Sequence, residues 1–181
     1  MTAVSIAGAV TAPRDKVYLV GFMAAGKTTV GRELAGRMGW VFLDIDERIE
    51  ERERSSVARI FATRGEQYFR QAERDVLHEQ VPIRQAIVAT GGGTFVDPDN
   101  RALIQADGIS VWLDAPLEAL MARLPTDGRR PLAADRQQLT QLYEHRRRAY
   151  AQASVRVDGD RLTVPAIVEY LLPLLQDLLR P

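Results

Sequence analysis

The sequence predicts an α/β fold in which a five-stranded parallel sheet carries helices on both faces. Short apolar runs rich in β-branched residues alternate along the chain with longer stretches of helical periodicity, the pattern of strands joined by crossover helices. No repeat, low-complexity tract or long linker interrupts this alternation, and 181 residues with 46% hydrophobic content suffice for one sizeable core. We therefore expect a single domain over residues 1–181.

The expected strands are the short apolar runs, and the expected helices are the periodic stretches between them. The strands are Lys16–Val20, Trp40–Asp44, Ala86–Thr90, Ile109–Asp114 and Val155–Val157. The helices are Lys27–Met38, Asp46–Arg52, Val57–Arg64, Glu66–Gln80, Pro98–Ala106, Pro116–Leu124, Gln137–Gln152 and Val164–Leu179. Residues 1–14 are small and apolar but lack the basic start of a signal peptide, so we expect a flexible N-terminal extension.

The composition argues against several classes of protein. The formal net charge is zero, which gives no reason to expect a nucleic acid partner. No apolar run approaches the length that spans a membrane. The chain has no cysteine, so disulfides and thiolate metal sites are excluded. The lack of cysteine suits a cytoplasmic protein without requiring it, and we expect a cytoplasmic monomer.

A phosphate-binding motif follows the first expected strand. Residues 21–28, "GFMAAGKT", fit the pattern G-x-x-x-x-G-K-[ST] between a strand and a helix. The glycines let the backbone wrap a phosphate, and the N–H groups at the helix start face it. Lys27 would reach the β- and γ-phosphates, and the Thr28 hydroxyl would ligate Mg²⁺. The alternative is a glycine-containing turn that binds nothing, but the setting favours a nucleoside triphosphate.

Two carboxylates follow the second expected strand. Ligands of an open parallel sheet bind at the carboxyl ends of its strands, so Asp44 and Asp46 would both lie at the ligand-binding edge. One could hold Mg²⁺ through water while the other accepts a proton from an attacking hydroxyl. The alternative for Asp46 is a structural role as the N-cap of its helix.

Three other features are candidates for a second subsite and a lid. The three glycines of residues 91–93 fit either close approach of a ligand to the main chain or a plain tight turn. Arg70 could clamp a carboxylate with two nitrogens, or it could be a solvated surface charge. The segment at about 124–136 carries prolines, a glycine and Arg130, as a mobile phosphoryl-transfer lid or an exposed linker would.

With these motifs in register, the chain resembles the shikimate kinase family from about residue 16 to residue 158. Six elements appear in family order: "GFMAAGKTTVGREL", "FLDIDERIE", "IFATRGEQYFRQAE", "TGGGTFV", "RRPL" and an arginine shortly before "YAQA". The resemblance implies a P-loop kinase three-layer sandwich with a mobile lid. It also implies ATP- and Mg²⁺-dependent phosphorylation of shikimate to shikimate 3-phosphate, on the route to chorismate and the aromatic amino acids.

The resemblance further implies a role for each matching residue. The catalytic residues are Lys27, Asp46 and Arg130. The ATP-binding residues are Ala24, Ala25, Gly26, Lys27, Thr28, Thr29, Arg123 near the adenine, and Arg130. The shikimate-binding residues are Asp46, Arg70, Gly92 and Arg146, with Phe61, Phe69 and Glu73 lining or bracing the pocket. The Mg²⁺-binding residues are Thr28, directly, and Asp44, through water.

The chain departs from the family pattern at two places. Ala24 stands where many relatives carry glycine, and we expect no effect because the motif does not require glycine there. Arg148 replaces a proline before Tyr150, so either Arg146 or Arg147 could be the arginine that contacts the substrate.

Two other functions remain open at this point. One is a small-molecule kinase of the same fold with gluconate or a nucleoside monophosphate as acceptor. The other is a non-catalytic nucleotide-binding regulator, although the guanine-specific N-K-x-D motif is missing from the sequence.

Overall fold

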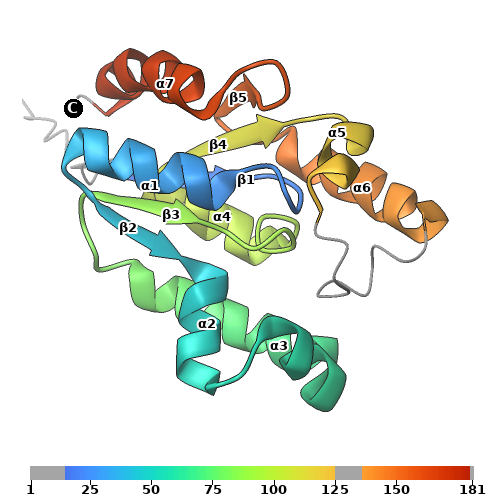
Figure 1. Cartoon of the computed structure of the whole chain (residues 1–181). Helices are drawn as coiled ribbons and strands as arrows, with labels where there is room; N and C mark the ends of the chain where they lie inside the picture. The colour runs from blue at the N-terminus through green and yellow to red at the C-terminus, as the bar shows by residue number, and fades with distance from the viewer. Residues whose placement is uncertain (1–14, 125–135, 180–181) are drawn as a thin grey trace, which may run out of the picture.

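Residues 15–124 and 136–179, which a computed structural model describes, form a sheet of five parallel strands flanked by helices (Figure 1). The strands are β1 (Lys16–Val20), β2 (Val41–Asp44), β3 (Ala86–Ala89), β4 (Ile109–Asp114) and β5 (Val155–Asp158). Their order in the sheet is β2-β3-β1-β4-β5, and every pairing is parallel. The predicted α/β fold is confirmed, and each strand differs from its expected bounds by at most one residue at either end.

The strand order places the ligand-binding edge, formed by the carboxyl ends of the strands, next to the end of the central strand β1. The chain passes from β1 out to β2, returns to β3 beside β1, and then builds β4 and β5 on the other side. This reversal of direction is the switch point at which open parallel sheets bind ligands, outside the carboxyl ends of their strands. Leu19, Ala89 and Asp44 lie in register across β1, β3 and β2. The segments that follow these strands therefore meet at one edge.

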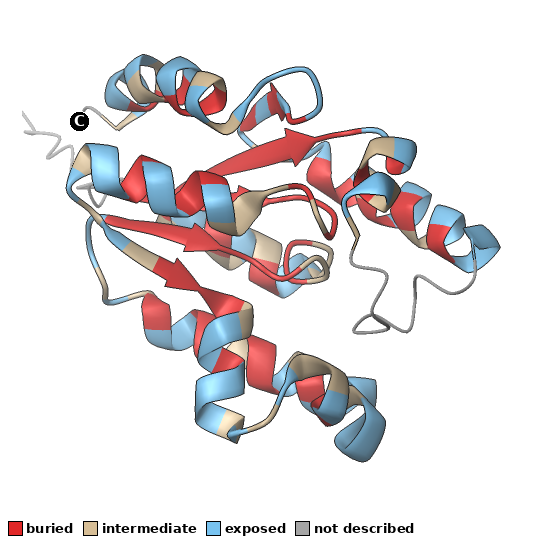
Figure 2. Ribbon diagram, in the orientation of Figure 1, coloured by how far each residue is buried: buried red, intermediate tan, exposed pale blue. Residues whose placement is uncertain are grey.

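Burial follows the position of each strand in the sheet (Figure 2). All residues of β1, β3 and β4 are buried, as expected for strands covered on both faces. The edge strand β5 alternates buried and exposed residues. The continuous apolar runs seen in the sequence are thus the central strands.

Helices cover both faces of the sheet, as predicted. They are α1 (Lys27–Met38), α2 (Ile45–Glu53), α3 (Val57–Gln80), α4 (Pro98–Asp107), α5 (Leu117–Ala122), α6 (Arg136–Tyr150) and α7 (Val164–Leu178). Helix α1 packs against α7 and the strands β1–β3, whereas α4 packs against β4 from behind (Figure 1). None of the helices within the described ranges combines the length and apolarity that crossing a bilayer requires.

Helix α3 is broken at Gly65, where the sequence predicts a boundary between two helices. Gly65 has φ 80° and ψ 171°, which is non-helical and lies in a region that only glycine adopts readily. The residues on either side are helical, so the two expected helices form one bent element.

Lys16 links α3 and α4 to the sheet at the amino end of β1, away from the ligand-binding edge. Its fully buried Nζ donates hydrogen bonds to the carbonyl oxygens of Gln80 (3.0 Å) and Val81 (2.9 Å), at the end of α3. It also forms a 2.6 Å ion pair with Asp107 at the end of α4, and Tyr18 donates to the same carboxylate. A buried charge needs such partners, and they tie α3 and α4 to β1.

Candidate active site

The loop between β1 and α1 has the geometry of a phosphate cradle. Gly21 and Gly26 have φ values of 143° and 90°, and a Cβ on Gly21 would lie 2.8 Å from the Leu113 carbonyl oxygen. No side chain caps the start of α1, which leaves its first N–H groups to a ligand. The Nζ of Lys27 donates to the carbonyl oxygens of Gly21 (2.9 Å) and Phe22 (2.8 Å). The ammonium group is therefore held over the loop.

Ala24 adopts a left-handed backbone in this loop, with φ 61°. That conformation costs a residue with a Cβ roughly 1–2 kcal/mol, whereas glycine adopts it without strain. The expectation that alanine at this position has no effect is therefore wrong for the backbone. The motif does not specify glycine here, but the shape of the loop favours it.

Asp44 connects the P-loop to the start of α2. Its Oδ1 accepts hydrogen bonds from the backbone N–H groups of Asp46 (3.0 Å) and Glu47 (3.3 Å), and its Oδ2 accepts from the Thr28 hydroxyl (2.7 Å). Asp44 is thus the N-cap of α2, which begins at Ile45. The alternative in which Asp46 caps the helix is wrong, because Asp46 occupies the second helical position.

The Thr28 hydroxyl and the Asp44 carboxylate fit a magnesium ion. Mg²⁺ prefers oxygen ligands and is usually bound by one or two protein groups together with waters and substrate phosphates. Within the described residues, no group of three or more His, Asp or Glu side chains could hold a metal without other ligands. An ion at Thr28 and Asp44 would therefore share its coordination with the phosphates.

Each glycine of the loop after β3 lies against a different polar side chain. A Cβ on Gly91 would lie 2.7 Å from Glu73 Oε1 and 2.8 Å from Asp46 Oδ1. A Cβ on Gly92 would lie 2.9 Å from Arg146 Nη1, and a Cβ on Gly93 would lie 2.6 Å from Arg70 Cζ. None of the three has a positive φ, so space rather than backbone conformation requires glycine here. A plain tight turn does not account for the sequence, because each missing side chain makes room for a charged one.

Arg70 is held in place by Glu66 and Glu73 of its own helix and, through Glu73, by Thr94. Its Nη1 donates to Glu73 Oε2 (2.8 Å), and the other oxygen of the buried Glu73 accepts from the Thr94 hydroxyl (2.6 Å). Burial disfavours the charge on Arg70, but the carboxylates of Glu73 and Glu66 together outweigh this and raise the pKa of Arg70 above its ordinary value. Only 22% of the Arg70 side chain is exposed, so the solvated surface charge is the wrong alternative.

Aromatic rings form one wall beside Arg70. The rings of Phe61 and Phe69 lie 4.6 Å apart, and the Arg70 Cζ is 5.3 Å from the centre of the Phe69 ring. The expected bracing residues Phe61, Phe69 and Glu73 therefore do lie around this arginine.

Of the two candidate arginines on α6, only Arg146 faces the glycine loop. Its Cζ lies 5.7 Å from the ring of Phe22 in the P-loop, and 8% of the residue is exposed. Burial lowers the pKa of Arg146 below its ordinary value. Arg147 instead turns toward β4, where it pairs with Asp114 (3.4 Å) and lies over Trp112.

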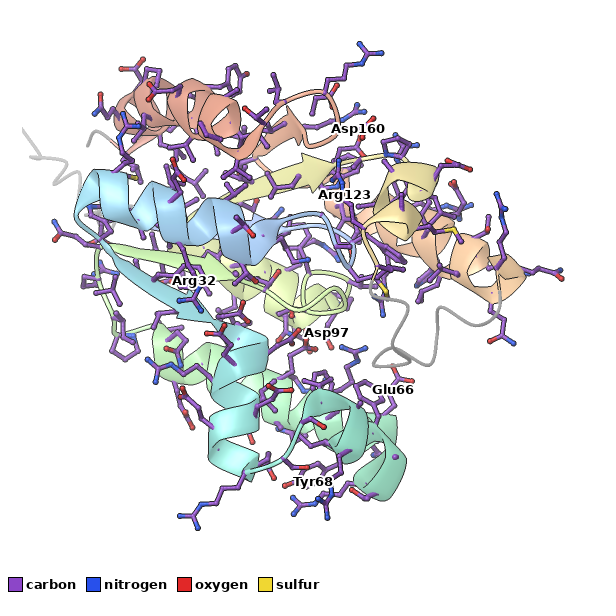
Figure 3. All side chains as sticks on the ribbon, in the orientation of Figure 1. Arg32, Glu66, Tyr68, Asp97, Arg123 and Asp160 are labelled. Carbon is purple, nitrogen blue, oxygen red and sulfur yellow. The ribbon has the colours of Figure 1, made fainter. Side chains whose placement is uncertain are left out.

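Arg123 lies at the end of α5 against the loop that follows β5. It donates to the Gly159 carbonyl oxygen and the Asp160 carboxylate, at 3.1 Å each (Figure 3). This contact joins the expected adenine-side arginine to the loop that follows β5. Ala25 is buried in the P-loop and Thr29 is exposed on α1. Arg130, like most of the expected lid at 124–136, lies outside the described residues.

Sequence reasoning missed two residues of this region. The Thr94 hydroxyl holds Glu73, and the Tyr150 hydroxyl donates a hydrogen bond to the Gly92 carbonyl oxygen. Thr94 directly follows the three glycines, which is a local signal that could have identified it. Tyr150 is 58 residues from Gly92, and no spacing rule connects them.

The fold and site together define a class of protein. A parallel sheet with a phosphate cradle after its central strand, and with a carboxylate and two arginines around the neighbouring loop, is that of a P-loop kinase acting on a small molecule.

Comparison with known proteins places the chain within this class. The family model described as shikimate kinase matches residues 23–176. The shikimate kinase of Persephonella marina is 38% identical over 86% of this chain and 96% of its own length. The solved shikimate kinase of Acinetobacter baumannii, in complex with shikimate, aligns with a TM-score of 0.84 and 35% identity over 90% of this chain and 93% of its own. The chain belongs to the shikimate kinase family, and the predicted resemblance is confirmed.

A more distant solved structure shares the fold alone. The gluconokinase of Sinorhizobium meliloti aligns with a TM-score of 0.60 at 18% identity, over 92% of this chain and 94% of its own. Its acceptor therefore gives no argument about the acceptor of this chain.

Proposed function

We propose that this chain transfers the γ-phosphoryl group of ATP to a hydroxyl of shikimate, which yields shikimate 3-phosphate for the synthesis of chorismate and the aromatic amino acids. One observation carries the choice of an anionic acceptor. Among the described residues, the buried Arg146 has no carboxylate within ion-pair distance, and the nearby charge of Arg70 further disfavours its own. A carboxylate bound between the two guanidinium groups would give Arg146 an anionic partner such as Arg70 already has in Glu73.

The acceptor subsite lies directly beside the phosphate cradle. A Cβ on Gly92 would lie 3.7 Å from the backbone nitrogen of Met23, so the glycine loop and the P-loop are in contact. Shikimate is a ring that carries one carboxylate and several hydroxyls. With its carboxylate on Arg70 and Arg146 and a hydroxyl on Gly92, another hydroxyl would reach Asp46.

The residues then divide the work of phosphoryl transfer. Asp46 accepts the proton of the attacking hydroxyl. Lys27 and the first N–H groups of α1 stabilise the charge that grows on the phosphoryl oxygens. Ala24, Ala25, Gly26 and Thr29 complete the phosphate cradle, and Arg123 lies on the adenine side. When bound at Thr28 and Asp44, Mg²⁺ would neutralise phosphate charge. Arg130, carried by a lid over about 124–136, closes onto the phosphates.

A coupled assay of ADP release, with and without shikimate, tests this function. We expect turnover that depends on ATP, Mg²⁺ and shikimate together, and little turnover with gluconate or a nucleoside monophosphate. Faster turnover with one of those acceptors would favour a different small-molecule kinase. Slow ATP hydrolysis that no acceptor accelerates would favour a nucleotide-binding regulator.

We also propose that the protein works as a cytoplasmic monomer of one domain, without a nucleic acid or membrane partner. The extension expected at 1–14 lies outside the described residues. Light scattering on the purified chain checks the monomer, and a mass of twice 20.2 kDa would contradict it.

A further inference from the structure

We infer that Tyr150 is a positioning residue of the acceptor subsite and that it acts by holding Gly92 and Arg146 in register. The inference rests on the proposed role of Arg146 in binding the acceptor carboxylate. Tyr150 would not touch the acceptor itself.

Tyr150 is fixed where α6 ends, between the sheet and the glycine loop. The residue is 1% exposed, and its ring lies 6.1 Å from the ring of Trp112 on β4, at 40° to it. Its hydroxyl donates a hydrogen bond to the Gly92 carbonyl oxygen. This bond turns the carbonyl toward α6 and so sets the orientation of the peptide that is expected to meet an acceptor hydroxyl.

The same hydroxyl also interacts with Arg146, one helical turn earlier on α6. A Cβ on Gly92 would lie 3.8 Å from the Tyr150 oxygen and 2.9 Å from Arg146 Nη1, so the three groups converge on one point. A phenol can donate one hydrogen bond and accept another. Burial raises the pKa of Tyr150, while the charge of Arg146 and, to a smaller extent, a hydrogen bond from it oppose this rise. The phenol therefore keeps its proton for Gly92 and offers its oxygen to the guanidinium.

Removal of this hydroxyl should loosen the carboxylate subsite and leave the phosphate cradle unchanged. Tyr150→Phe keeps the ring and its packing on Trp112. The lost bond to a charged group corresponds to a rise of about tenfold or more in the KM for shikimate. The KM for ATP and the turnover number should stay within about twofold, because Lys27 and Asp46 keep their partners.

A matched control lies on the same helix. Tyr143 is also buried, and its hydroxyl donates to a main-chain oxygen, that of Ala115 (3.0 Å), outside the acceptor subsite. Tyr143→Phe removes a comparable bond and should leave the KM for shikimate within about twofold. Thermal unfolding of both variants checks that the folds are equally retained. A similar rise in the KM for both variants would overturn the inference, because it would indicate a general loss of helix packing.

A double-mutant cycle with Arg146→Gln separates this inference from the proposed function. If Tyr150 acts through Arg146, Tyr150→Phe should raise the KM for shikimate much less in the Arg146→Gln background than in the parent. Equal effects in both backgrounds would overturn the inference. If Arg146→Gln alone leaves the KM unchanged, the proposed carboxylate site is wrong. If Arg146→Gln raises it and Tyr150→Phe does not, only the inference about Tyr150 is wrong.

Discussion

The substitution Gly93→Ala tests the acceptor subsite with the addition of one methyl group. A Cβ at this position would lie 2.6 Å from the Arg70 Cζ and 2.8 Å from its Nη2. The backbone itself accepts alanine, because the φ of Gly93 is not positive. The three atoms nearest to the new methyl group therefore all belong to the guanidinium group of Arg70.

The size of the effect follows from the distance that Arg70 must move. Ordinary van der Waals contact begins at 3.4 Å, so the guanidinium group has to retreat by roughly 1 Å. A misplacement of about 1 Å in a positioning group can cost about 100-fold in efficiency. We expect the KM for shikimate to rise about 10- to 100-fold, with the KM for ATP nearly unchanged. Stability should fall by about 1–3 kcal/mol at most, because the retreat of Arg70 weakens its ion pair with the buried Glu73.

The assay is steady-state kinetics with each substrate varied in turn, next to a thermal melt. Gly36→Ala is the matched control, since Gly36 lies within α1 and a Cβ there would meet nothing within 4 Å. That variant should keep both KM values, and its free energy of unfolding should rise by up to about 1 kcal/mol because alanine has the higher helix propensity. A Gly93→Ala enzyme whose KM for shikimate stays within twofold of the parent would refute the placement of Arg70 at the acceptor.

Four further substitutions test the phosphate cradle, the base and the lid. Lys27→Ala should lower turnover about 100-fold or more with the fold intact, and turnover within a few-fold of the parent would contradict the P-loop assignment. Asp46→Asn should lower turnover by about 100-fold or more, without loss of stability because Asp44 caps α2. An unchanged turnover would show that Asp46 is not the base. Ala24→Gly should raise the melting temperature by a few degrees, since the relief of backbone strain exceeds the entropy that glycine adds to the unfolded chain; a lower melting temperature would count against strain there. Arg130→Ala should reduce turnover far more than shikimate affinity, and a pure binding defect, seen by calorimetry, would place that arginine outside catalysis.

The fold was accessible from the sequence because its signals are local. Buried parallel strands appear as short apolar runs, and β1 with its following motif is one such run next to an unmistakable glycine pattern. The helix breaks were accessible for the same reason, as Gly65 shows. The expected start of α2 was one residue late, because both Asp44 and Asp46 have the chemistry of an N-cap.

The site was predicted less completely because its geometry depends on contacts between distant segments. Three consecutive arginines on α6 point in directions about 100° apart, and the sequence does not say which one faces the glycine loop. The structure turns Arg146 toward Gly92 and Arg147 toward Asp114. The backbone cost of Ala24 was not foreseen, because a motif records residue types only. The left-handed backbone at this position of the loop is seen only in the structure.

The placement of the two lysines has a practical consequence for chemical labelling. The chain carries 22 arginines but only Lys16 and Lys27. Lys16 is fully enclosed between β1, α3 and α4, whereas Lys27 is partly accessible in the phosphate cradle. Apart from the terminal amine, an acylating reagent that attacks primary amines would therefore find a single side chain on the folded protein, and that side chain lies in the loop proposed to bind the nucleotide. Mass spectrometry of the acylated peptide would measure nucleotide occupancy directly, without a radioactive or fluorescent ligand.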